Sequence, residues 1–224
     1  MALKDEHIGQ FIAKYIKDGD VVSIGTSDLG EKFVKKLALA LEEKGEKVKI
    51  VPTSAKVAGL AAAMGIETTT LNKEEIDIAI EFVDMVDDDF NFIKRDSHSL
   101  VRDKMIGQSA EVMVAVAEEE NFVKKLGGSI PFEIAPFGHM RTVMQLGKLG
   151  KAMLRMDGKK EAMTESGNYL ADVDVDSVYS LEDLEYQAKE IPGVLETGLF
   201  IGYADRVILH GGDKIRVKSR MNYT

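Results

Sequence analysis

Short apolar runs alternate with longer segments of helical periodicity along the first half of the chain. The runs are rich in valine and isoleucine and are typical of buried strands: Val21–Ile24, Val48–Val51, Ile76–Phe82 and Val112–Val116. Between them, Gly30–Lys44 has apolar residues at helical spacing, and Ala55–Met64 is an alanine-rich segment that Gly65 ends. This alternation predicts βαβ units around a parallel sheet.

The pattern changes after the pair Gly127 and Gly128. The next segments are typical of strand, helix, strand, strand, helix and strand, in that order: Ile130–Phe137, Arg141–Leu149, Ala152–Met156, Tyr169–Val175, Leu181–Ile191 and Val194–Phe200. That order is the ferredoxin-like pattern, and a last strand over Arg206–His210 is expected to return to the first sheet. We therefore expect an α/β fold with a Rossmann-like parallel sheet domain, residues 1–128 completed by 201–224. A ferredoxin-like α+β domain is expected as an insertion at 129–200.

Composition narrows the classes of protein to consider. About 45% of the 224 residues are apolar and 30% are charged, as in ordinary globular proteins. The absence of cysteine excludes disulfides, thiolate metal sites and thiol nucleophiles. The net charge of −9 without long Lys/Arg clusters argues against nucleic acid as a partner. No apolar run approaches a membrane span and Met1–Lys14 lacks the apolar core of a secretion signal, so we expect a cytoplasmic protein that binds no membrane.

The turn after the first predicted strand contains Gly25, Thr26, Ser27 and Asp28 and precedes a helix. Unpaired N–H groups at such a place form a natural anion site, although the glycines match neither the dinucleotide nor the Walker pattern. Two interpretations stay open, because Ser27 or Asp28 could equally cap the helix. A carboxylate about 5 Å from a phosphate costs roughly 3 kcal/mol at a dielectric constant near 20, or about a hundredfold in affinity, unless a cation offsets it.

Acidic residues follow the third predicted strand, where ligands bind in open α/β sheets. Glu81 and Asp84 could supply two carboxylates there, ahead of Lys94 and Arg95, or the run to Asp89 could be a solvated turn. A helix is expected from Ser97 to Gln108, and its Asp103 and Lys104 are expected at the surface by composition alone. The histidines lack metal-ligand spacing, so no metal site is expected: His7, His98, His139 and His210.

Several longer motifs occur in a fixed order along the chain. They are Ser23-Ile24-Gly25-Thr26, Pro52-Thr53-Ser54 with Gly65-Ile66, Asp77–Lys94, Arg102-Asp103-Lys104, Pro131–Pro136, Thr164–Asn168 and Ile191–Phe200. Taken together they resemble, nearly end to end, the motifs of the ribose-5-phosphate isomerase A family. The resemblance implies a Rossmann-like domain with a ferredoxin-like lid, and a homodimer or homotetramer. It also implies interconversion of ribose 5-phosphate and ribulose 5-phosphate through a cis-enediol, in the non-oxidative pentose phosphate pathway, with a sugar phosphate as the only ligand and no metal or cofactor.

The resemblance also assigns residues. The carboxylate base falls on Asp103, where the family has glutamate, and the other catalytic positions fall on Asp84, Lys94 and Glu81. The substrate-binding positions fall on Gly25, Thr26, Ser27, Asp28, Arg95, Ser97 and Asn121. The segments Pro131–Pro136 and Pro192–Phe200 are expected to be scaffold without chemistry of their own.

The chain departs from the family pattern mainly at these site motifs. Asp28 adds a negative charge to the phosphate loop, Phe82 replaces a glycine that would meet the sugar, and Asn121 stands where a lysine is usual. Two interpretations follow. Either the site is remodelled and works, with Arg95 as the cation that offsets Asp28, or the chain is a catalytically weak or silent relative. Such a relative would bind another sugar or metabolite as a sensor or structural subunit.

Overall fold

The larger sheet of the molecule has seven strands. The computed structural model describes residues 8–175, 178, 180–211 and 214–220. In spatial order the strands are β16 (Lys214–Ser219), β15 (Arg206–Gly211), β7 (Ala110–Glu118), β4 (Ile76–Phe82), β1 (Val21–Ile24), β2 (Lys49–Pro52) and β3 (Glu67–Thr68). All neighbours are parallel except β15 and β16, which form an antiparallel hairpin. The predicted parallel sheet is confirmed, and so is the return of the Arg206 strand to it.

The chain reverses its direction of travel across this sheet between β1 and β4. From β1 it proceeds outward through β2 to β3, whereas β4 starts a second series that continues through β7 to β15. In open α/β sheets ligands bind beyond the carboxyl ends of the strands at such a reversal. The turns after β1 and β4, which carry the predicted site residues, therefore meet where a ligand site is expected.

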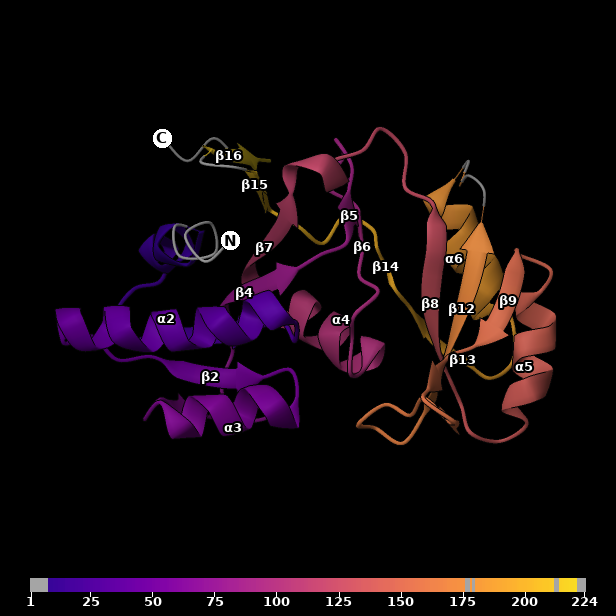
Figure 1. The fold of residues 1–224 in the computed structure, drawn as a ribbon, viewed down its shortest axis with the longest axis horizontal. Coiled ribbons are helices and arrows are strands. Elements are labelled where there is room, and N and C mark those ends of the chain that lie inside the picture. Colours follow the sequence, from indigo (N-terminus) through magenta and orange to yellow (C-terminus); the bar gives the residue numbers. More distant parts are fainter. Residues whose placement is uncertain (1–7, 176–177, 179, 212–213, 221–224) are drawn as a thin grey trace.

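Helices cover both faces of the large sheet (Figure 1). On one face lie residues 8–12, α2 (Asp28–Lys44) and α3 (Ala55–Ala63), whose apolar side chains pack on alternate residues of the strands. The other face packs against α4 (Leu100–Ser109) through Ile106 and against Phe92 and Phe200 of the short strands described below. The short turns η1 (Ala13–Tyr15) and η2 (Glu119–Asn121) complete this part.

The second sheet has four strands and lies in the chain between β7 and β15. Its elements are β8 (Gly128–Ile134), α5 (His139–Leu146), β9 (Lys151–Leu154), β12 (Tyr169–Val175), α6 (Leu181–Lys189) and β13 (Val194–Thr197). The strands are antiparallel in the order β13-β8-β12-β9, as in ferredoxin-like folds. We call this sheet with α5 and α6 the insert. The α/β fold class and the ferredoxin-like order predicted from the pattern are confirmed.

Short strands join the two sheets and were not predicted. β5 (Met85–Val86), β6 (Phe92–Ile93) and β14 (Leu199–Phe200) form a small antiparallel sheet, so the expected strand over 194–200 divides into β13 and β14. Gly198 at the division accepts the N–H of Lys94 at 3.0 Å and donates to the carbonyl of Pro131 at 2.7 Å. A Cβ there would lie 2.4 Å from the Pro131 ring, so only glycine permits this crossing. A hairpin of β10 (Met156–Asp157) and β11 (Lys160–Glu161) extends from the insert.

Helix α4 lies between the two sheets (Figure 1) and contacts β4 and β7 of one and β8 and β13 of the other. It begins at Leu100 rather than at the predicted Ser97, because the Ser99 hydroxyl caps it by accepting the N–H of Arg102. Among the helices of the described residues, none combines the length and the apolar character that a membrane crossing requires.

Candidate active site

Three charged side chains meet between the two sheets: Glu81, Lys94 and Asp103. Glu81 stands near the end of β4, Lys94 follows β6, and Asp103 lies in the first turn of α4. The Lys94 ammonium binds the Glu81 carboxylate directly and lies 3.2 Å from Oδ2 of Asp103. All three residues are at most 1% exposed. The structure thus brings together three of the four residues predicted to be catalytic.

Burial and charge act in opposite directions on this cluster. Burial raises the pKa of Glu81 to about 7, although Lys94 acts to lower it. Burial also acts to lower the pKa of Lys94, but the carboxylates of Asp103 and Glu81 outweigh it and hold that pKa above its usual range. Lys94 is therefore an ammonium at neutral pH, and Glu81 exchanges its proton in the same range. Two buried carboxyl groups that share one cation and one exchangeable proton are suited to proton transfer.

The turn after β1 approaches Glu81 closely. A Cβ on Gly25 would lie 2.0 Å from Oε2 of Glu81, so no other residue leaves room for this carboxylate. The next residue, Thr26, is hydrogen-bonded to the hydroxyls of Thr53 at 2.8 Å and Ser54 at 2.7 Å. The hydroxyl of Ser27 accepts the N–H of Gly30 at 2.9 Å, which makes Ser27 the cap of α2. The capping interpretation of this turn is confirmed for Ser27.

A cavity of about 220 Å³ opens beside these turns. Its lining includes five residues predicted from the sequence or adjacent to them: Ser27, Asp28, Asp84, Asp96 and Asn121. Glu118 and His210 lie at the same cavity, and none of its described lining residues is Lys or Arg. Across the described residues, no group of three or more His, Asp and Glu side chains is placed to hold a metal ion. The cavity therefore has carboxylates beside an apolar part of the lining.

Arg95 and Asp84 are both engaged beside the site. Asp84 accepts the backbone N–H of Arg95 at 2.6 Å. The Arg95 guanidinium donates to the carbonyls of Ser129 at 2.8 Å and Gly127 at 3.1 Å. It is therefore directed toward β8 of the insert, and its role as the phosphate cation that offsets the charge of Asp28 stays a prediction.

Two expectations about exposure are wrong. Asp103 and Lys104 are buried, because α4 is covered by the insert as well as by the large sheet. Lys104 lies 2.8 Å from the Glu196 carboxylate and also binds Glu185. Phe82 is 7% exposed and its ring packs 6.2 Å from the ring of Phe33 on α2, but Phe82 also lines the cavity, so its conflict with a ligand there stays a prediction.

The remaining predicted residues are placed as follows. Ser97 donates to Oδ2 of Asp103 at 2.6 Å, so it contacts the cluster itself. Asn121 ends η2 at the cavity. The acidic run forms a turn in which the Asp87 carboxylate accepts the N–H groups of Asp89 and Asn91. The turn was predicted, but it is only partly solvated, because Asp88 and Asp89 are exposed whereas Asp87 is buried.

Glu133 was missed by the sequence analysis, which treated Pro131–Pro136 as scaffold. It is 0% exposed and accepts hydrogen bonds from Ser99, Val101, Thr164 and Asn168. A signal was present, because a glutamate between Phe132 and Ile134 in an apolar strand requires several partners if it is buried.

Comparison with known proteins places this geometry in a family. Residues 49–214 match the family described as ribose 5-phosphate isomerase A (phosphoriboisomerase A). The chain is 34% identical over 221 residues to ribose-5-phosphate isomerase A 2 of Oceanobacillus iheyensis, covering 97% of this chain and 99% of that one. It is 31% identical over 206 residues to ribose-5-phosphate isomerase A of Methanothermobacter thermautotrophicus, covering 90% and 91%.

Solved structures agree with the sequence comparisons. Ribose 5-phosphate isomerase A of Methanocaldococcus jannaschii superposes with a TM-score of 0.90 at 26% identity, covering 96% of this chain and 98% of that one. A D-ribose-5-phosphate isomerase in complex with phospho-erythronic acid superposes with a TM-score of 0.91 at 27% identity, covering 98% and 99%. The family match spans well over half of the chain, and the relatives are matched almost end to end. This chain belongs to the ribose 5-phosphate isomerase A family.

Proposed function

We propose that the protein is an aldose-ketose isomerase that interconverts ribose 5-phosphate and ribulose 5-phosphate, a step of the non-oxidative pentose phosphate pathway. Family membership supports the reaction, and one observation supports its survival in this chain. Lys94 contacts both Asp103 and Glu81, all three side chains are buried, and they stand at the sequence positions that match the family's motifs. Although Asp103 stands where the family has glutamate, these three side chains still lie together.

We assign proton transfer between C2 and C1 to Asp103. Its Oδ2 already accepts from Ser97 and lies beside Lys94, so Oδ1 is the oxygen that we assign to the substrate proton. Lys94 offsets the charge of Asp103 and would stabilise negative charge that develops on the sugar oxygens. Glu81, with its pKa near neutrality, would supply or accept the proton that moves on those oxygens.

We place the substrate in the cavity beside the turns after β1 and β4. Thr26, Ser27 and Asp28 would approach the phosphate through the backbone N–H groups at the start of α2. Gly25, whose own N–H donates to the carbonyl of Ile80, would contribute the space at this turn. Asp84 and Asn121 would face the sugar hydroxyls from the other side of the cavity. The cluster is sealed in this structure, so the substrate reaches Asp103 only when the covering chain moves. Arg95 would serve as a phosphate cation only after leaving the carbonyls of Ser129 and Gly127.

Proton NMR of ribose 5-phosphate in D₂O with the purified protein tests the proposal. We expect ribulose 5-phosphate to form with uptake of deuterium at C2, at about one turnover per second or faster, as is usual for enzymes. Phospho-erythronic acid, which is bound in a related structure, should compete with the substrate. Absence of both conversion and exchange from folded protein, beside an active family member as positive control, would contradict the proposal.

The cavity itself favours a second candidate function. Asp28, Asp84, Asp96 and Glu118 line it without a described Lys or Arg, which disfavours a phosphate dianion. A catalytically weak or silent relative that binds another sugar or metabolite would have such a site. Binding of uncharged pentoses without turnover of ribose 5-phosphate would favour this alternative.

Three wider assignments complete the proposal. We divide the chain into a Rossmann-like domain of residues 1–128 and 201–224 and a ferredoxin-like lid of residues 129–200, as the two sheets suggest. We expect a homodimer or homotetramer, and a mass near the monomer's 24.7 kDa by light scattering would contradict this. The cytoplasmic location stays a prediction from composition.

A further inference from the structure

Glu133 is a fully buried carboxylate whose hydrogen-bond partners among the described residues are all uncharged. Its side chain accepts from the hydroxyl of Ser99 at 3.1 Å, the N–H of Val101 at 3.0 Å, the hydroxyl of Thr164 at 2.9 Å and the amide of Asn168 at 2.8 Å. A carboxylate that has lost its water is costly unless hydrogen bonds replace that water. Four donors converging on one side chain indicate a built arrangement that the packing of an apolar strand does not require.

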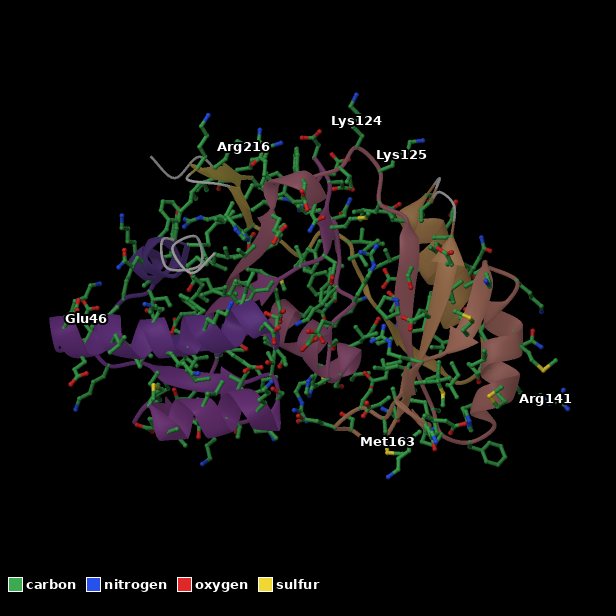
Figure 2. The ribbon with its side chains drawn as sticks, viewed as in Figure 1. Glu46, Lys124, Lys125, Arg141, Met163 and Arg216 are labelled. Carbon is green, nitrogen blue, oxygen red and sulfur yellow. The ribbon has the colours of Figure 1, made fainter. Side chains whose placement is uncertain are left out.

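The Glu133 carboxylate accepts hydrogen bonds from two parts of the molecule. At the beginning of α4, Val101 donates to Oε2, and the Ser99 hydroxyl lies 3.1 Å from Oε2 and 3.3 Å from Oε1. Oε1 also accepts from Thr164 and Asn168, which lie at the two sides of the turn that precedes β12. Glu133 therefore fastens residues 162–168 of the insert to the beginning of α4, beside a direct contact of 3.2 Å between the hydroxyls of Ser99 and Ser166. Figure 2 labels Met163 of this segment, whose side chain points outward.

The beginning of α4 determines where Asp103 lies. The N–H of Asp103 donates to the carbonyl of Ser99 at 3.0 Å, one turn earlier in the chain. The N–H of Ser99 donates in turn to the hydroxyl of Ser97, which binds the Asp103 carboxylate. A displacement of Ser99 would therefore move Asp103 in two ways: through the backbone hydrogen bond from Asp103 to Ser99, and through Ser97, which binds the Asp103 carboxylate.

The turn at 162–168 also contacts the large sheet's helices. The Glu165 carboxylate accepts the N–H of Ala55 at 2.9 Å, at the start of α3, and binds Arg102 at 2.8 Å. Burial acts to raise the pKa of Glu165, but the hydrogen bonds from Ala55 and Arg102 outweigh burial and lower that pKa. The Glu165 carboxylate therefore stays charged. Ala55 directly follows Thr53 and Ser54, the partners of the turn after β1. The turn at 162–168 therefore contacts two segments of the proposed site: the start of α3, next to the partners of Thr26, and the first turn of α4, which carries Asp103.

We propose that Glu133 is a positioning residue, which links the docked turn at 162–168 to the first turn of α4 and so sets Asp103 against Lys94. This role rests on the proposed function, because it assigns proton transfer to Asp103. It does not involve contact between Glu133 and the substrate. The juxtaposition that carries it is one buried carboxylate that accepts hydrogen bonds both from the turn and from the beginning of the helix.

The substitution Glu133→Gln tests the link directly. An amide has one acceptor oxygen, so its NH₂ would face donors on one of the two sides. We expect kcat to fall by roughly ten- to a hundredfold, since misplacement of a reacting group by about 1 Å costs about a hundredfold, while KM changes less than about threefold. Glu161→Gln makes the same chemical change at an exposed site of the insert and should leave both constants unchanged.

A second measurement does not need activity. Carbon-13 NMR of the carboxyl groups follows the titration of Glu81. The negative charge of the neighbouring Asp103 acts to raise the pKa of Glu81. If Glu133→Gln withdraws Asp103, the Glu81 inflection moves to lower pH, and Glu161→Gln leaves it in place. Thr164→Val, which removes one donor and keeps the shape, should give a smaller shift in the same direction, and Thr164→Ser should restore the wild-type value.

Two results would overturn the inference. Lower thermal stability with unchanged kcat per folded molecule and an unchanged Glu81 titration would show that Glu133 only supports the fold. An unchanged titration in Thr164→Val would give the same answer if Glu133→Gln failed to fold. If wild-type protein turned over no ribose 5-phosphate, the proposed function would fail by itself, and the titration would still decide whether Glu133 positions Asp103.

Discussion

The buried cluster and the neighbouring cavity differ in how their charges are arranged. In the cluster, the Lys94 ammonium lies between Glu81 and Asp103, and all three side chains are closed off from water. In the cavity, carboxylates such as Asp28 and Asp96 line open space with no described cation among the lining residues. Lys94 thus offsets carboxylate charge within the cluster, whereas the described residues that line the cavity include carboxylates and no Lys or Arg to offset them.

The two regions correspond to two different requirements of an isomerase that acts on a sugar phosphate: proton transfer and phosphate binding. Proton transfer requires carboxyl groups at fixed distances in a dry place, which is how the cluster arranges Glu81 and Asp103. Phosphate binding requires positive potential, for which the cavity has the N–H groups at the start of α2 and Lys56, which interacts electrostatically with Asp28 and Asp96. We therefore expect the substitutions in this chain to reduce the affinity for a phosphate more than they reduce the rate of proton transfer.

The largest expected effect follows from Asp103→Asn. The amide cannot accept the substrate proton, so we expect turnover to fall at least a thousandfold, or about 4 kcal/mol in the barrier. Because Asp103 is buried against Lys94, the substitution should also lower the free energy of unfolding by about 1–3 kcal/mol. NMR exchange at C2 and urea unfolding measure the two effects separately.

Asp183→Asn is the matched control for this substitution. Asp183 also lies in the first turn of a helix, α6, but it is exposed. It should change turnover and stability by little. Residual turnover near the wild-type rate in Asp103→Asn would remove Asp103 from the mechanism and leave the buried cluster as a structural feature.

The same contrast shows what the sequence could predict. Isoleucine-rich runs such as Ile76–Phe82 predicted the strands because their period and composition are local properties. The burial of Asp103 and Lys104 was not predictable from α4 alone, since it depends on the insert packing over the helix. The direction of Arg95 depends in the same way on the carbonyls of Ser129 and Gly127, more than thirty residues away. Local patterns thus predict the fold, whereas the burial and the direction of the charged side chains depend on long-range contacts.

The next effect concerns stability and distinguishes the cluster from ordinary surface acids. The native pKa of Glu81, about 7, lies above the ordinary 4.5, so the native state keeps a proton that the unfolded chain releases between these values. The free energy of unfolding should therefore decrease as pH rises from about 4.5 to about 7, by up to roughly 3 kcal/mol. Glu165 and Glu196, whose pKa values are lowered, act below pH 4.5 and outside this window.

Glu81→Gln should remove this slope. Urea unfolding at pH 5 and pH 7.5 measures it in both proteins, and Glu182→Gln on the exposed face of α6 is the control. An equal slope in wild type and Glu81→Gln would show that Glu81 is ionised throughout this range. The cluster would then carry a net negative charge, and its role in exchanging a proton near neutral pH would be lost.

The smallest expected effect tests the cavity. Asp28 is exposed at the start of α2 and also acts electrostatically on Lys56, so its repulsion of a phosphate is weaker than the 3 kcal/mol expected for a screened interior. We expect Asp28→Ser to tighten binding of phospho-erythronic acid by about five- to tenfold, or roughly 1 kcal/mol, in calorimetry at low salt. Asp28→Asn keeps the shape and should tighten binding similarly, and added salt should reduce the gain in both. Unchanged or weaker binding would show that the phosphate lies elsewhere, and the cavity would then belong to the sugar or to an uncharged ligand.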